Sequence, residues 1–376
     1  PPPPLRGNSM LLRELLKKEN NNLDIFRVLA ALLVIYGHAY AILPNPGRSD
    51  VIGRLLGFDY SGSLAVKVFF FLSGLVVTNS LMGKRNVFQF VISRTFRIWP
   101  AFIVVLMVSS LLLGSLFTSL PLGTYFMHEK MHDYVTHTGL MSVRYALPGV
   151  FEDMTRSAVN GSLWSIPYEV AAYIILLCLF LLRVLDVRPA ATFVFLLILV
   201  DAALGNTILF TWLPDNAEVI TLAPCFAFGA LLALWKDRVT ISISLCVGAW
   251  GLYWMLDASA FNYYFFYAAF FLSILYLSGL EMVIALKPKV DVSYGVYLWG
   301  WPTQQVFAYF FVDYGLRFNQ LGAMIVALLL GWASWHLIEK RSMRFGSKLS
   351  RDLSGLMSKT SVEKYNTGSV QPGDQN

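Results

Sequence analysis

Residues 23–43 read LDIFRVLAALLVIYGHAYAIL, and this stretch decides the class of fold. Only Asp24, Arg27 and His38 interrupt a run of apolar and aromatic residues. About 20 such residues are enough for a helix to cross the hydrocarbon core of a bilayer. In hydrocarbon a helix satisfies its own backbone hydrogen bonds, whereas an isolated strand cannot. The stretch therefore predicts a transmembrane helix.

The whole chain has the composition of an integral membrane protein. Of its 376 residues, 56% are hydrophobic and 14% are charged, and the mean hydropathy is +0.59. Soluble domains carry about 25% charged residues. We therefore predict an all-α fold, a polytopic membrane helix bundle of about ten transmembrane helices. The predicted spans are 23–43, 62–82, 98–117, 165–184, 190–211, 217–235, 240–256, 261–280, 291–312 and 320–338.

The distribution of positive charge predicts how the bundle is oriented. With a cytoplasmic N-terminus, inner segments hold 22 of the 29 Lys and Arg residues and outer segments hold six, while Lys67 lies within a span. Lys and Arg are enriched on the cytoplasmic side of membrane proteins. Both termini are therefore predicted to be cytoplasmic. The same distribution accounts for the net charge of +6, so no nucleic-acid partner is expected.

Three segments are expected along the chain. Residues 1–19 form a leader or tag and a cytoplasmic N-terminal segment, with Met10 as a plausible native start. Residues 20–345 form the membrane domain, and residues 346–376 form a polar cytoplasmic tail that is predicted to be disordered. The three cysteines fall inside predicted spans, where small packing residues are expected, so no disulfide framework is predicted.

The long outer loop, residues 118–164, invites a metal-site interpretation. His128 and His132 stand one helical turn apart in it. No HExxH or Cys/His signature completes a ligand set, so solvated histidines on an amphipathic surface helix are the preferred interpretation and no metal is predicted. The role of this loop stays open.

The first predicted helix carries two ionisable groups on one face. Arg27 and His38 are eleven residues apart, which on a helix is about 1100°, only about 20° beyond three turns, with a rise of about 16 Å. Asp24, three residues before Arg27, can pair with it. The plainer alternative is that Arg27 anchors the topology and His38 is a satisfied interface residue. Ionisable groups within a membrane are nevertheless functional candidates by default.

Further candidates come from the following spans. Lys67 lies in GSLAVKVFFFLSG, residues 62–74, and either binds substrate or reaches the outer interface. Arg94 and Arg97, one turn apart, can form with Arg27 a cationic rim suited to phosphate, or can simply set the topology. Glu169 is expected near the depth of His38, where it would orient that side chain as a general base; the alternative is a carboxylate stabilised by a helix N-terminus.

Taken together, these segments resemble the membrane acyltransferase-3 family, the integral membrane O-acyltransferases of bacterial surface polysaccharides and related glycans. The pieces occur in family order over about residues 20–345. They are Leu23-Asp24…Arg27…His38, Phe69-Phe70-Phe71-Leu72-Ser73-Gly74, Arg94…Arg97-Ile98-Trp99-Pro100, Ser162-Leu163-Trp164-Ser165…Glu169, Ser293-Tyr294-Gly295…Tyr297-Leu298-Trp299…Trp301-Pro302 and His336…Glu339-Lys340. One departure is Gly300, where many members have histidine.

The resemblance implies an enzyme of the bacterial inner membrane that transfers an acyl group from acetyl-CoA, its co-substrate, to a saccharide acceptor. It implies His38 as the essential histidine, acting as general base or acyl carrier, with Glu169 beside it. Arg27, Arg94 and Arg97 would bind the nucleotide of the acyl-CoA. Trp164, Ser165, Tyr168 and Lys67 are the candidates for substrate binding. Neither the acceptor, the acyl group nor the oligomeric state follows from the sequence.

Two rival functions are weighed against this one. A transporter or flippase of a lipid-linked glycan would also have ten spans, but it usually has repeat symmetry or broken helices, and we detect neither in the sequence. A structural membrane subunit would leave the shared face of Arg27 and His38, and an intramembrane Glu169, without a purpose.

Overall fold

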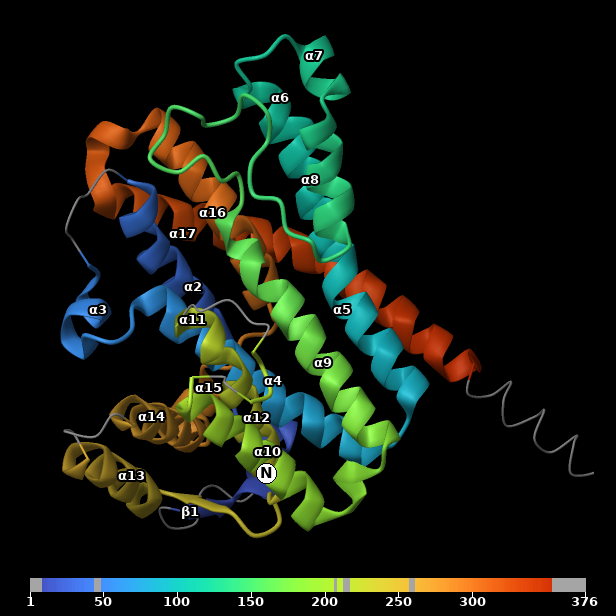
Figure 1. Ribbon diagram of the computed structural model, residues 1–376, viewed down its shortest axis with the longest axis vertical. Coiled ribbons are helices and arrows are strands. Elements are labelled where there is room, and N and C mark those ends of the chain that lie inside the picture. The colour runs from blue at the N-terminus through green and yellow to red at the C-terminus, as the bar shows by residue number, and fades with distance from the viewer. Residues whose placement is uncertain (1–8, 44–48, 206–207, 212–216, 257–260, 354–376) are drawn as a thin grey trace, which may run out of the picture.

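The computed structural model describes residues 9–43, 49–205, 208–211, 217–256 and 261–353 (Figure 1). These residues form almost only helices. The longer ones are α2 (Leu23–Ile42), α4 (Ser61–Lys84), α5 (Val87–Val108), α8 (Glu129–Gly139), α9 (Ile166–Leu181), α10 (Arg188–Ala203), α12 (Leu222–Leu234), α13 (Ile243–Met255), α14 (Asn262–Ser278), α16 (Ser293–Phe310) and α17 (Gly315–Ser334). Short helices connect them: α1 (Leu12–Leu15), α3 (Val51–Leu56), α6 (Gly114–Phe117), α7 (Leu122–Met127), α11 (Ala217–Ile220) and α15 (Glu281–Ala285).

Every predicted span contains a helix, and five helical segments are long and apolar enough to cross a membrane. These are Leu23–Ile42, Ser61–Lys84, Val87–Phe117, Gly161–Leu181 and Val312–Leu353. Three further apolar helices are shorter, at 10–17 residues: Glu218–Leu234, Ile243–Met255 and Asn262–Ser278. The protein is therefore an all-α bundle with five candidate membrane spans among its described residues.

The N-terminal boundary differs from the prediction. Ser9 and Met10, in the predicted leader and N-terminal segment, belong to strand β1 (Ser9–Leu11), which pairs antiparallel with β2 (Thr240–Ser242). Met10 lies opposite Ile241, which is 1% exposed. The segment predicted as a span from residue 240 thus begins as a strand and becomes α13 only at Ile243. A three-residue strand has no amphipathic period that sequence patterning can detect.

The centre of the bundle depends on small residues, and Ser73-Gly74 follows the bulky run Phe69-Phe70-Phe71-Leu72 in the sequence. A Cβ atom at Gly74 of α4 would lie 2.0 Å from the carbonyl oxygen of Phe226 in α12. A Cβ atom at Gly229 of α12 would likewise lie 2.2 Å from the Phe71 carbonyl oxygen. Small residues allow membrane helices to approach closely and gain van der Waals contact. This crossing fixes the position of α4, and with it the side chains that α4 presents to the site.

The predicted outer loop, residues 118–164, folds onto α5 through α8, and α7 packs against α8, at the top of Figure 1. Tyr134 of α8 is fully buried, and burial raises the pKa of its hydroxyl well above the ordinary range. His132 contacts the Phe126 carbonyl oxygen at 2.9 Å, and His137 contacts Asp133 at 3.1 Å. Within the described residues, no group of three or more His, Cys, Asp or Glu side chains is arranged to hold a metal ion.

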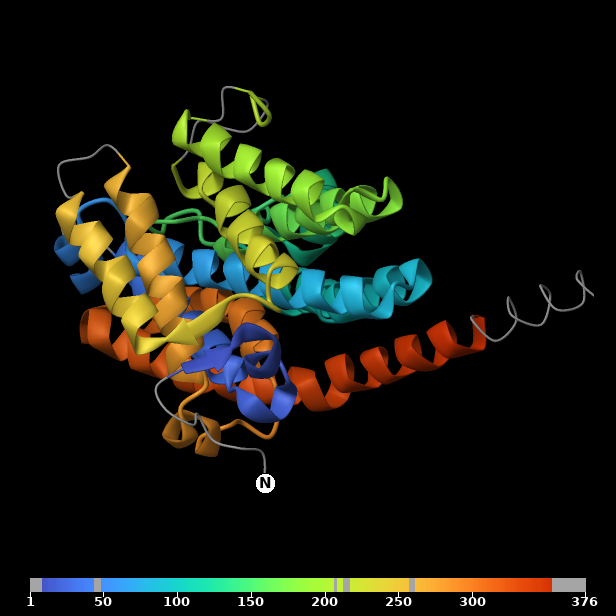
Figure 2. The same cartoon turned by 90° about the horizontal axis from the view of Figure 1, so that it is seen from below.

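The last helix continues beyond its predicted end. It contains a π-helical turn, Trp335–Glu339, and remains helical to Leu353, so the predicted tail starts as helix at residues 346–353. Residues 354–376, the rest of that predicted tail, lie outside the described residues. Figures 1 and 2 show the end of this helix extending away from the bundle.

Candidate functional site

A cavity of about 470 Å³ lies between α2, α4, α5, α9 and α16. Small-molecule sites usually have volumes of about 300–1,000 Å³. Five of the predicted site residues line this cavity: Arg27, Arg94, Arg97, Ser165 and Glu169. The fold therefore brings the proposed cationic rim and the intramembrane carboxylate to one place.

Arg27 is held at the start of α2. Its guanidinium pairs with Asp24 at 3.1 Å, which confirms the predicted pairing. The side chain of Asn22 caps this helix by accepting from the Ile25 N–H at 3.1 Å, and it donates to the Val283 carbonyl oxygen at 2.6 Å. The helix start and the segment before α16 are thus tied together beside the cavity.

Arg97 is neutralised by two carboxylates. Its guanidinium lies 2.5 Å from Asp291 and 3.3 Å from Glu339, and it stands over the Tyr294 ring. Glu339 sits in the π-helical turn and is 1% exposed. A buried carboxylate needs such a partner because desolvating an unpaired charge is costly. Arg97 therefore joins α5 to α16 and the last helix, and most of its charge is already balanced.

Arg94 differs from its neighbour. In the part of the chain that the structure describes, no carboxylate lies within ion-pair distance of its guanidinium, which stands 5.8 Å from the centre of the Tyr173 ring. Tyr173 donates to the Glu169 carboxylate at 2.5 Å, and its hydroxyl lies 2.8 Å from that of Ser73. Glu169 also accepts from Ser73 at 3.3 Å. Arg94 is thus the guanidinium most available to an anion in the cavity.

The rim carries an excess of positive charge. Five cationic side chains line the cavity, Lys18, Arg27, Arg94, Arg97 and Lys287, against three carboxylates, Asp24, Glu169 and Asp291. Lys287 donates to the carbonyl oxygens of Lys18 and Asn21. Its burial lowers the pKa of the Lys287 ammonium. The excess favours an anionic ligand at this end.

His38 lies outside this cavity, and the structure does not pair it with Glu169. Its ring packs edge-on against Trp301 with centroids 4.8 Å apart, and the residue is 8% exposed. Among the described residues, its buried Nδ1 atom has no hydrogen-bond partner. The prediction that Glu169 contacts His38 is therefore wrong, because the Glu169 carboxylate accepts hydrogen bonds from Ser73 and Tyr173 instead.

Ser165 and Tyr297 line the cavity, and Tyr297 stands one turn of α16 before Trp301, which contacts His38. The Tyr297 hydroxyl donates to the Ser162 carbonyl oxygen at 2.5 Å and lies 2.6 Å from the Ser165 hydroxyl. Its ring packs edge-on against Phe69, another lining residue. Trp301, which contacts His38, is four residues further along α16, a rise of about 6 Å. The contacts of Tyr297 thus separate the cationic cavity from the histidine.

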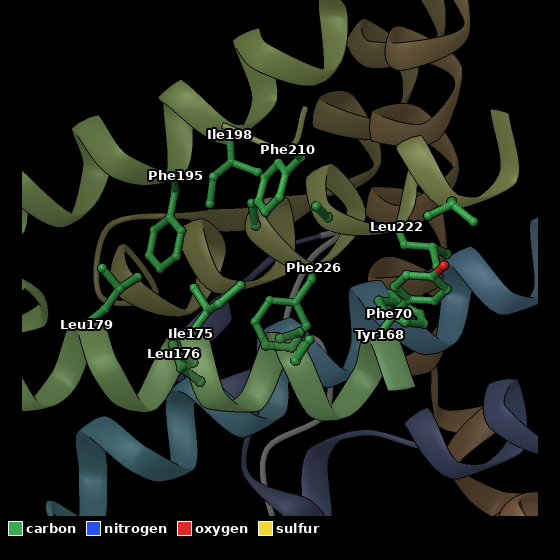
Figure 3. A pocket seen from close by; sticks show the side chains of 15 residues that line it. Phe70, Tyr168, Ile175, Leu176, Leu179, Phe195, Ile198, Phe210, Leu222 and Phe226 are labelled. Atoms are coloured by element: carbon green, nitrogen blue, oxygen red, sulfur yellow. The ribbon is translucent and has the colours of Figure 1, made fainter. Parts of the chain in front are cut away.

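The remaining predicted substrate residues lie elsewhere. Lys67 is buried against Asp59 and Tyr267, with its ammonium 2.9 Å from an oxygen of each. Tyr168 lines a separate apolar pocket between α9, α10 and α12, and Figure 3 shows it there with Phe226 and Phe195. Trp164 packs against Tyr168 with ring centroids 6.2 Å apart. None of these three lines the cationic cavity.

Several lining residues were missed by the sequence reasoning. Tyr173 stands four residues after Glu169, so the helical period alone places both on one face. Asp291 had a signal of its own, as a carboxylate at the start of an apolar segment. Asn21 and Lys287 had none, because their roles depend on contacts between distant segments.

Comparison with known proteins agrees with these observations. The family model described as "Acyltransferase domain" matches residues 20–336. The chain is 26% identical over 352 residues to an "O-acetyl transferase" of Shigella phage Sf6, covering 89% of this chain and 99% of that protein. It is 30% identical over 167 residues to "Nodulation protein 10" of Rhizobium leguminosarum bv. viciae, covering 42% of this chain and 43% of that protein. No solved structure matches it.

Proposed function

Because the chain belongs to this acyltransferase family, we propose that it is a membrane O-acetyltransferase that moves an acetyl or other short acyl group from coenzyme A to a saccharide hydroxyl. The relative named as an O-acetyl transferase supports the type of ester that is formed. The observation that carries the proposal is the cationic cavity, which is lined by Arg27 at one helix start and by Tyr297, one turn of α16 before the Trp301 ring that contacts His38.

The donor half of the proposal uses the charge of the cavity. The nucleotide of an acyl-CoA carries several phosphate charges, and the excess of cationic side chains at the rim suits it. Arg94 would bind phosphate directly, because its fork of N–H donors is not occupied by a carboxylate. Arg27 and Arg97 would contribute to the field while their paired carboxylates hold them in place.

The proposed topology is ten membrane crossings in the cytoplasmic membrane of a bacterium, with both termini in the cytoplasm. Five helical segments of spanning length and three shorter apolar helices support several crossings, and the distribution of Lys and Arg supports the orientation. In that orientation the arginine end of the cavity faces the cytoplasm, where acyl-CoA is made. The saccharide acceptor would then approach His38 from the outer side.

The transfer step needs the thioester to reach His38. The pantetheine arm would extend from the rim through the cavity and past Tyr297, whose hydrogen bonds to Ser162 and Ser165 would open. The acceptor oxygen would attack the thioester carbonyl carbon as His38 takes its proton. The carbon–sulfur bond then breaks, and the same proton passes to the thiolate, which leaves as coenzyme A. Acyl transfer through the histidine itself is the main variant.

Glu169 takes a different role from the one expected of it. Its contacts with Tyr173 and Ser73 support a role at the wall of the donor cavity. There the carboxylate would order Tyr173 beneath the Arg94 guanidinium.

The experiment is acyl transfer from labelled acetyl-CoA by the purified, membrane-inserted protein. We expect CoA release with an acceptor, complete loss of transfer with intact donor binding in His38→Ala, and weaker donor binding in Glu169→Ala, because Tyr173 would no longer be ordered beneath Arg94. A correctly folded His38→Ala protein that works at the wild-type rate would disprove the role of the histidine. Acceptor transport without CoA release would identify a transporter instead.

A further inference from the structure

Buried polar atoms without a partner occur on the segments that pack near His38, α16 and the segment before α9. Among the described residues, His38 Nδ1, Ser162 Oγ, Gln304 Oε1 and Gln305 Oε1 have no hydrogen bond. His38 is 8% exposed, and the other three residues are 0% exposed. Each unsatisfied buried group costs about 1–3 kcal/mol, and buried polar groups are otherwise almost always paired. Four of them in one neighbourhood therefore indicate a place made for a ligand.

A chain of contacts through α16 links the four residues to one another. The Trp301 ring contacts His38, and its Nε1 atom donates to the Ala158 carbonyl oxygen at 2.8 Å. Gln305, one turn further along α16, donates to the same carbonyl at 2.7 Å. The backbone carbonyl oxygen of Ser162 accepts from Tyr297, which stands one turn before Trp301. Gln304 donates to the carbonyl oxygen of Ile35, one turn before His38 in α2.

The side-chain N–H groups of Gln304 and Gln305 already donate hydrogen bonds, so only their Oε1 atoms are free to accept one. The Gln305 Nε2 atom donates to the carbonyl oxygens of Arg156 and Ala158. The Gln304 Nε2 atom donates to the Ile35 carbonyl and to Asn319 Oδ1. Flipping either amide would set its oxygen against these acceptors, so the assignment follows from the chemistry. Both Oε1 atoms are therefore offered to a molecule that donates hydrogen bonds.

The chemical groups of these four residues indicate which class of ligand they can bind. None of its four residues is a carboxylate, so a cation would be desolvated there without a counter-charge. Two amide oxygens and a hydroxyl are suited to neutral O–H donors, and an aromatic ring stands beside them. We propose that Ser162, Gln304 and Gln305 form a subsite that binds hydroxyl groups of the saccharide acceptor next to His38. This inference rests on the proposed function, since it places the acceptor against the proposed base.

Ser162 gives the sharpest test. Its Oγ atom has no hydrogen bond in the described structure, so Ser162→Ala removes an acceptor for the ligand without removing an internal contact. Thr78→Val is the matched control, because Thr78 also has a fully buried hydroxyl without a partner in the described structure, but it lies towards the C-terminal end of α4 and belongs to none of the contacts above. Both variants should melt at or above the wild-type temperature.

Assays with two different acyl acceptors distinguish a loss of acceptor binding at the subsite from a loss of acyl transfer itself. Hydroxylamine is a small nucleophile that traps the acetyl group as a hydroxamate without sugar recognition, and glycerol is the polyhydroxyl probe. We expect hydroxamate formation to be equal in the wild type, Ser162→Ala and Thr78→Val. We expect the half-saturating glycerol concentration to rise about two- to tenfold in Ser162→Ala alone, the value of one neutral hydrogen bond.

The possible results distinguish failure of the proposed subsite from failure of the proposed function. An unchanged half-saturating glycerol concentration in Ser162→Ala overturns the subsite, and so does an equal rise in Thr78→Val. Hydroxamate formation without any saturable response to glycerol overturns it as well. Failure of the wild-type protein to form hydroxamate above the level of His38→Ala overturns the proposed function, and the subsite with it.

Discussion

Arg94 and Arg97 are one helical turn apart, yet we expect their alanine variants to fail in different ways. The Arg97 guanidinium holds Asp291 at 2.5 Å and Glu339 at 3.3 Å, whereas Arg94 has no carboxylate within ion-pair distance in the described structure. Removing one partner of a buried ion pair costs about 3–5 kcal/mol, because the other charge stays buried. Arg97→Ala should therefore lower the melting temperature strongly.

For Arg94→Ala we expect normal stability and weak donor binding. A hydrogen bond between charged groups is worth about 1.5–3 kcal/mol, which corresponds to a rise of about 10- to 150-fold in the dissociation constant for acetyl-CoA. Arg94→Lys keeps the charge but loses the paired donors, so its affinity should be intermediate.

Calorimetric titration of each variant with acetyl-CoA at fixed ionic strength, beside a thermal melt in detergent, measures both quantities. If Arg94→Ala binds acetyl-CoA within twofold of the wild type, Arg94 does not contact the phosphates. If Arg97→Ala has the melting temperature of the wild type, Asp291 and Glu339 do not need Arg97 as an ion-pair partner.

Three further substitutions examine the packing and the separation of the two compartments. Gly74→Ala should lose about 1–3 kcal/mol of stability through overpacking. Gly83→Ala in the same helix should melt at the wild-type temperature, because a Cβ there meets nothing within 4 Å. Equal melting temperatures for the two variants would contradict the close crossing. Lys67→Met should destabilise the protein by about 3–5 kcal/mol, because it leaves the buried Asp59 carboxylate without its ion-pair partner. The double variant Lys67→Met, Asp59→Asn should recover most of that loss in the same thermal melt. Tyr297→Phe removes the hydrogen bonds to Ser162 and Ser165, so acetyl-CoA hydrolysis without acceptor should rise; unchanged CoA release would mean that Tyr297 does not separate the cavity from His38.

The helices could be predicted from the sequence because their signal is local. A run of apolar residues has the same meaning wherever it lies, and the close crossing at Gly74 was marked by small residues after bulky ones. The pairing of Ser9–Leu11 with Thr240–Ser242 was missed because it joins segments more than 200 residues apart through a strand too short to have a period. The final helix was cut short because polar residues at 346–353 resemble a tail when no partner is known.

The site was predictable where one helix carried the information. The spacing in α2 and α5 was enough to select Arg27, Arg94 and Arg97, and all three line the cavity. Depth along the membrane normal was a poorer guide, because it matched Glu169 to His38 without saying which way each side chain turns. Rotation about the α9 axis directs Glu169 towards Ser73 and Tyr173. The partners of Lys67 come from a loop and from α14, so its span alone could not name them.

The two faces of α9 limit how this helix can change in evolution. Ser165, Glu169 and Tyr173 face the polar cavity, while Tyr168, Ile175 and Leu179 face the apolar pocket of Figure 3. Inserting one residue between Ser165 and Glu169 would turn everything after it by about 100°. The carboxylate would leave the polar side, and a hydrocarbon side chain would take its place. Substitutions can accumulate along this helix, but gaining or losing a single residue there should be forbidden.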